Sequence, residues 1–168
     1  MLCGGAARSA GCAEYVADGE SKKERRQEKK KSNKNQPQRL LLTWLVEHPE
    51  MYQYIRAYIG ADDFIEPLYH SVAIMLFEQL DNEEKINPAA ILSRFTDAEE
   101  QKEIAAIFNT HLKYGLSSED EDKALSDVVR KVKLASIEDE MVHTSDIVRW
   151  QELLSLKNKM QKFSISRS

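Results

Sequence analysis

The chain has 168 residues, the size of one ordinary domain, and 42% of them are apolar, which is enough for a buried core. No stretch approaches the roughly 20 apolar residues of a membrane span, and the N-terminus lacks the apolar segment of a signal peptide. Its two cysteines, Cys3 and Cys12, fit neither a paired zinc-ligand pattern nor a disulfide framework. We therefore expect a soluble cytoplasmic protein with no cofactor, no metal site and no contact with a membrane.

The charge is distributed unevenly along the chain. The net charge of −4 divides into +4 over residues 1–36, −7 over 37–116 and −1 over 117–168. Residues 1–36 have little apolar surface to bury, so this segment is predicted to be a disordered basic tail or linker whose charged part can be helical. The basic run over 22–34 can contact nucleic acid weakly, although a solvated linker is the simpler interpretation.

Three helices are predicted in the first half of the ordered region, which should begin near Pro37. Apolar residues at helical spacing predict a first helix that stops at His48-Pro49, and a second helix should run from Glu50 to Gly60. The third helix, from Pro67 to Leu80, is apolar nearly all round. This pattern is typical of a helix in the middle of a bundle.

Two shorter helices follow, and both begin with recognisable capping residues. Asn87-Pro88 supplies an N-cap followed by proline at the first helical position. The segment Thr96–Glu99 has the pattern of a capping box, and the helix that it starts should turn Ile104 and Ile107 inward.

The last 53 residues contain neither glycine nor proline, as long helices require. A second capping box at Ser118–Glu121 starts a long helix that should end near Met141. The polar residues 143–146 interrupt it, and Thr144 or Ser145 can cap a final helix. We predict an all-α fold: a helical bundle over 37–116, then a long helix and a C-terminal helical hairpin over 117–168.

The sequence lacks the motifs that carry common enzyme chemistry. It contains no glycine-rich phosphate loop, no Gly-x-Ser-x-Gly and no His-Glu-x-x-His, and its four histidines are scattered. The acidic run Glu119–Asp122 is interpreted as the charged first turn of a helix and not as a magnesium site. Asp62-Asp63 is similarly expected to cap the helix that follows it. We therefore predict that the chain is not an enzyme.

The final helix carries more apolar residues than a self-contained hairpin needs. Ile147, Trp150, Leu153, Leu154, Met160 and Phe163 recur at the spacing of a helix that binds in a groove or on another helix. The alternative is that this stripe packs on the long helix or on the bundle.

Several segments resemble the C-terminal domain of bacterial replicative primase (DnaG). They are Arg39–Leu45, Pro49–Tyr52 and Phe64–Tyr69, together with Leu134, Ile137, Asp146-Ile147, Gln151–Leu153 and Lys157 near the end. The resemblance covers about residues 37–165. It implies an all-α module with a helical bundle and a terminal hairpin, similar in fold to the N-terminal domain of the replicative helicase.

The resemblance also implies a function. This domain docks on the DnaB-type replicative helicase and so recruits primer synthesis to the replication fork. The implied partner-binding residues are Ile147, Trp150, Leu153, Leu154, Lys157 and Met160. The chain has neither the zinc-binding domain nor the catalytic core of a full primase, so it should not make primers alone.

Two other functions are compatible with the sequence. A similar fold occurs in the N-terminal collar domain of the helicase itself, which would self-associate and continue into an ATPase domain. A small nucleic-acid-binding protein would instead use the basic run 22–34, and its binding would weaken steeply with salt.

Overall fold

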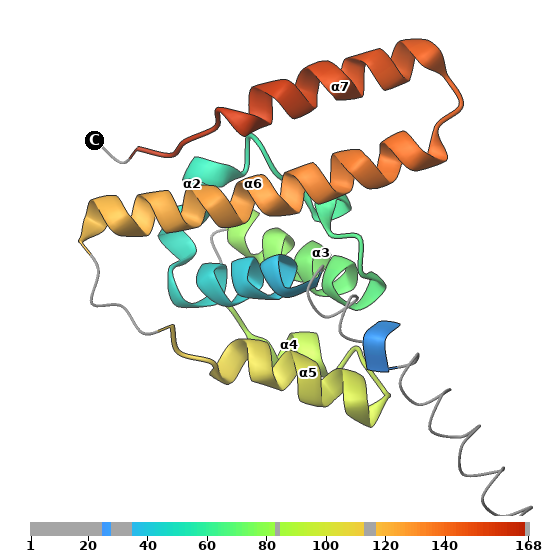
Figure 1. Ribbon diagram of the computed structural model, residues 1–168. Coiled ribbons are helices and arrows are strands. Elements are labelled where there is room, and N and C mark those ends of the chain that lie inside the picture. The colour runs from blue at the N-terminus through green and yellow to red at the C-terminus, as the bar shows by residue number, and fades with distance from the viewer. Residues whose placement is uncertain (1–24, 28–34, 83–84, 113–116, 167–168) are drawn as a thin grey trace, which may run out of the picture. The chain divides into compact units, whose positions relative to one another are not determined.

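The helix over residues 35–47 lies at the centre of the fold. A computed structural model describes residues 25–27, 35–82, 85–112 and 117–166 (Figure 1). Five consecutive side chains, Leu41–Leu45, are each at most 4% exposed. Since consecutive residues on a helix are 100° apart, this helix is covered on all sides at that level. As predicted, it ends before His48-Pro49.

The described residues form an all-α fold, which confirms the predicted fold class. Gln36–Ser168 form one compact unit, which is separate from the segment before it. Of the basic tail predicted over 1–36, residues 25–27 are helical and exposed, whereas 1–24 and 28–34 lie outside the described residues. Residues 35 and 36 are not part of a tail, because they begin the helix over 35–47. In the described part, no helix is long and apolar enough to cross a membrane.

The predicted position of the third helix needs correction. Helix α3 (Pro67–Asp81) begins at Pro67 as expected, but only one of its faces is buried. That face carries Tyr69, Val72, Ala73, Leu76 and Phe77, whereas Ile74 is 47% exposed. The buried positions recur every three or four residues, so they form a stripe. The middle of the bundle is therefore the helix over 35–47, and α3 packs at its side.

The predicted second helix is broken into short pieces. A 3-10 turn η1 (Pro49–Met51) leads into α2 (Tyr52–Ile55), and a second 3-10 turn, η2 (Ala61–Asp63), follows. The Tyr58 N–H donates to the Ile55 carbonyl oxygen at 2.9 Å, three residues back, which tightens the chain and ends the helix. Met51, Ile55 and Ile59 still point into the core.

Tyr52 gives the bundle a predicted dependence on alkaline pH. Burial, with a hydrogen bond to Asp81, raises the pKa of Tyr52 from its ordinary value near 10 to about 12. The unfolded chain therefore loses this proton first, and the free energy of unfolding should fall as pH rises from about 10 to about 12. In urea denaturation across this interval, Tyr52→Phe should show a shallower fall than the wild type. Equal slopes would contradict the assignment.

Helices α4 (Pro88–Leu92) and α5 (Ala98–Asn109) close the bundle. Asn87 caps α4 as predicted, since its Oδ1 accepts from the Ala90 N–H at 3.1 Å. The cap of α5 is Asp97, whose Oδ1 accepts from the N–H groups of Glu99 and Glu100. The predicted capping box at Thr96 was thus one residue early.

Polar contacts attach α5 to the rest of the bundle. The Tyr69 hydroxyl donates to Glu103 Oε1 at 2.8 Å, and Arg39 Nε lies 3.3 Å from the same oxygen. Glu47 accepts from the Leu112 N–H at 3.0 Å. These three contacts join segments far apart in the sequence. Helix α5 and the residues just after it are therefore held by specific polar bonds as well as by the buried Ile104 and Ile107.

Helix α6 (Ser118–His143) runs across the bundle, and its first half belongs to the main core through Leu125, Val128, Val129 and Val132. Its cap is Ser117 and not Ser118, and the acidic residues Glu119, Asp120 and Glu121 lie in its first turn. In the residues that the structure describes, no group of three His, Cys, Asp or Glu side chains could hold a metal ion.

Asp63 does not cap α3, contrary to the prediction for Asp62-Asp63. Its carboxylate accepts from the Gly60 N–H at 2.9 Å and pairs with Lys133 Nζ of α6 at 2.9 and 3.0 Å. The N-cap residue of α3 is Glu66, which makes no side-chain capping bond. Asp63 is 7% exposed, and a carboxylate buried to this extent needs an opposite charge beside it. Lys133, 70 residues later in the sequence, supplies that charge.

Candidate functional site

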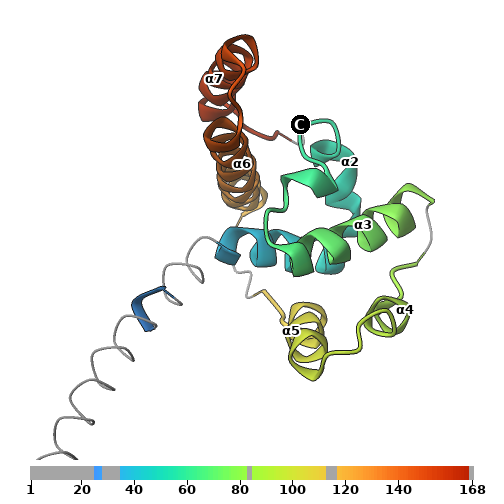
Figure 2. The same cartoon turned by 90° about the vertical axis from the view of Figure 1, so that its right-hand side faces the viewer.

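The C-terminal hairpin consists of the second half of α6 and α7 (Ile147–Gln161). Figures 1 and 2 show α7 alongside α6, on the side away from α4 and α5. Asp146, and not Thr144 or Ser145, caps α7 by accepting from the Val148 N–H at 2.9 Å. The hairpin predicted from the polar break at 143–146 is therefore present, with its second helix beginning slightly later than expected.

The two helices of the hairpin pack through a small apolar cluster. Ile137, Leu153 and Met160 are at most 4% exposed, and Leu134, Met141 and Phe163 pack against them partly buried. Two ion pairs flank the cluster: Arg149 Nε lies 2.7 Å from Glu140 Oε1, and Lys157 Nζ lies 2.9 Å from Glu138 Oε1. The cluster is separate from the main core and has only three buried residues. The hairpin therefore buries little apolar surface of its own.

The six residues predicted to bind a partner fall into two groups of three. Leu153 and Met160 are buried against α6, and Lys157 is occupied by Glu138. The alternative expectation, that the stripe packs on the long helix, therefore holds for this group. Ile147, Trp150 and Leu154 are 73%, 42% and 38% exposed. These three recur at helical spacing along one side of α7, where a partner can reach them.

The structure adds exposed apolar residues that were not in the predicted site. Val148 and Leu156 lie on the other side of the buried row of α7, and Val142 lies at the end of α6. They are 65%, 36% and 81% exposed. The sequence shows that these residues are apolar. The spacing of apolar residues alone, however, does not indicate which side of α7 packs on α6 and which side stays exposed.

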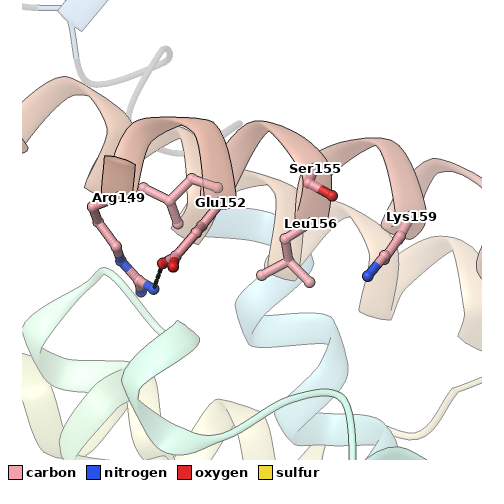
Figure 3. A pocket seen from close by; sticks show the side chains of 6 residues that line it. Arg149, Glu152, Ser155, Leu156 and Lys159 are labelled. Carbon is pink, nitrogen blue, oxygen red and sulfur yellow. Dashed lines mark hydrogen bonds and ion pairs between the residues drawn. The ribbon is translucent and has the colours of Figure 1, made fainter. Parts of the chain in front are cut away.

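A shallow groove runs along this other side of α7. It is lined by Arg149, Glu152, Leu153, Ser155, Leu156 and Lys159. Figure 3 shows the side chains of Arg149, Glu152 and Lys159 on one side of the helix, with Leu156 between them. Arg149 Nη1 lies 3.2 Å from Glu152 Oε2, and the hydrogen bonds to Glu140 and Glu152 raise the pKa of Arg149. The guanidinium is therefore held as a fixed cation between two carboxylates.

Exposed apolar side chains are concentrated on the hairpin. Of the nine large apolar side chains that are exposed in the described part of the chain, six lie between residues 142 and 156. Single exposed apolar residues are common on any protein, so the concentration on the hairpin makes it the candidate site of this structure. We call Ile147, Trp150 and Leu154 the docking face of α7.

The comparisons with known proteins identify no relative. No family model matches the chain, and no curated protein and no solved structure matches it either.

Proposed function

We propose that this chain is a protein-docking module that binds its partner through the docking face of α7. The observation that carries the proposal is the exposure of Ile147, Trp150 and Leu154 along one side of α7. Trp150 is the natural anchor, because tryptophan is enriched among the residues that dominate binding energy. Ile147 and Leu154 extend its apolar surface along the helix, and this pattern suits a partner that offers a groove or another helix.

The partner that we propose is the DnaB-type replicative helicase. This proposal makes the chain the helicase-binding domain of a bacterial primase, acting at the replication fork in the cytoplasm and not as an enzyme by itself. It is supported by the resemblance of Arg39–Leu45, Pro49–Tyr52 and Phe64–Tyr69 to that domain. It is also supported by the architecture, since a helical bundle followed by a hairpin is what the resemblance implies.

The positions of the resembling segments suit the proposal. Residues 39–45 form most of the buried central helix. Pro49–Tyr52 comprises the 3-10 turn η1 and the first residue of α2. Phe64 is 2% exposed and Tyr69 is 7% exposed. These segments therefore shape the core of the bundle, which fits a resemblance of fold, whereas the proposed contact with the helicase lies on α7.

The proposal is tested by calorimetric titration of the full chain into the replicative helicase of the same organism. Saturable binding is expected, and it should resist moderate salt because the docking face is apolar. Binding that weakens steeply with salt would instead indicate charge-driven association. No binding at micromolar concentrations would refute the helicase as partner.

A further inference from the structure

The segment after α7 folds back onto the bundle. The ring of Phe163 packs on the ring of Tyr58, with centroids 4.6 Å apart. Two residues later, Ile165 is 7% exposed and belongs to the main core together with Leu125 and Val129 of α6. Residues 162–166 therefore return the end of the hairpin to the first half of α6.

Two hydrogen bonds fix the backbone of this segment. Arg130 Nη2 donates to the Phe163 carbonyl oxygen at 2.6 Å, and Arg130 Nη1 lies 2.8 Å from Asp127 Oδ1, which orients the guanidinium. The Ile165 N–H donates to Ser126 Oγ at 2.8 Å. Both backbone groups are thus bonded to α6 side chains 33 and 39 residues earlier in the sequence.

This segment also joins two apolar clusters. The cluster between α6 and α7 has only three buried residues, whereas the main core is much larger. Phe163 packs against both of them. The C-terminal end of α7 is therefore connected to the main core through Phe163 and Ile165, in addition to its own contacts with α6.

We propose that residues 162–166 form a latch that holds α7 on α6 and so fixes the orientation of the docking face. Phe163, Ile165 and Arg130 act as positioning residues, since they hold the helix without belonging to the docking face. When the latch opens, α7 is held on α6 only by the small cluster and two ion pairs. It then separates from α6 more often, and each separation exposes its buried face. The consequence for binding rests on the function proposed above, because a preorganised helix binds with a smaller ordering cost.

The latch itself can be tested without any partner. A reporter chain carries Met160→Cys, with Cys3→Ser and Cys12→Ser to remove the natural thiols. Met160 is 4% exposed, so labelling of the reporter by a maleimide should be slow. Adding Phe163→Ala or Arg130→Gln should speed labelling by about tenfold or more, because opening exposes the thiol. Arg130→Gln removes the hydrogen bond to the Phe163 carbonyl oxygen and leaves the apolar residues of the latch in place. It therefore tests the latch even if Phe163→Ala fails to fold.

Two controls make the labelling experiment specific. Ser164→Ala lies in the latch but is exposed, so it should leave the labelling rate unchanged. A reporter at Leu156→Cys, on the exposed side of α7, should label at the same rate with and without the latch variants. Unchanged labelling of the Met160→Cys reporter in both latch variants, with helicity intact, would overturn the latch.

Helicase titration then separates the latch from the proposed function. The dissociation constant of Phe163→Ala should rise in inverse proportion to the fraction of molecules that stay latched, while Ser164→Ala binds like the wild type. Faster labelling with unchanged affinity would overturn the role of the latch in docking. Faster labelling in a chain whose wild type does not bind the helicase would support the latch and refute the proposed function.

Discussion

Trp150→Glu is expected to weaken binding to the partner by a factor of about 30 or more while leaving the helical content of the chain unchanged. Trp150 is 42% exposed, so an exposed carboxylate at this position stays solvated in the free chain. In the complex the same carboxylate would be buried in an apolar contact without a partner. Loss of a tryptophan anchor costs about 2–4 kcal/mol, which is a loss of roughly 30-fold to 1,000-fold in affinity. Calorimetric titration measures the affinity, and circular dichroism measures the helical content.

Gln151→Glu is the matched control for this variant. Gln151 is the exposed neighbour of Trp150 in the same helix, and its substitution adds the same charge without removing an apolar side chain. It should bind like the wild type. If Trp150→Glu also binds like the wild type, the docking face is wrongly placed. If both variants lose binding equally, added charge and not the indole explains the loss.

Leu45→Ala should lower the free energy of unfolding by about 3–5 kcal/mol, as expected for a leucine truncated in a tightly packed core. Leu45 is 0% exposed and lies on the central helix, which is covered on all sides. The cavity therefore has no route by which solvent can fill it. Urea denaturation followed by circular dichroism should report a lower midpoint for the whole compact unit, with no change in the slope.

Leu153→Ala provides the contrast. Leu153 is 1% exposed but belongs to the small cluster of the hairpin. Its truncation should loosen α7 and leave the bundle nearly as stable as in the wild type. Hydrogen exchange should accelerate in residues 147–161 and stay slow in the helix over 35–47. Equal loss of protection in both regions would contradict the division of the core into two clusters.

The element pattern was predictable because it depends on local chemistry. Apolar residues at helical spacing, the proline at Pro67 and the Asn87 cap each act within one or two turns of helix. The caps of α5, α6 and α7 were each displaced by one or two residues. In each case neighbouring residues, such as Thr144, Ser145 and Asp146, can all serve as a cap. Which residue takes the role is set by how the helix packs, which the local sequence does not contain.

Contacts between distant segments could not be predicted. Asp63 pairs with Lys133 across 70 residues, and Ile165 is bonded to Ser126 across 39 residues. Neither pair has a local signal, because each depends on how α6 crosses the bundle. The same reason explains why the third helix was expected at the centre. The apolar content of α3 is high, but apolar content alone does not place a helix at the centre. The central helix is the one that the other elements surround, and this is the helix over 35–47.

The candidate site was half predictable for a related reason. The final helix has apolar residues on more sides than one neighbour can cover, so its sequence indicates surplus apolar surface. It does not indicate which side faces α6. Because of the position of α6, Leu153 and Met160 are buried between the two helices of the hairpin. Ile147, Trp150 and Leu154 remain exposed to solvent.

The most direct test of the docking face is hydrogen exchange of the chain, free and saturated with the replicative helicase. Binding should slow exchange over residues 147–156 and leave the helix over 35–47 unchanged, since that helix is already buried. Slower exchange confined to residues 37–112, with α7 unaffected by the helicase, would contradict the account and place the contact on the bundle.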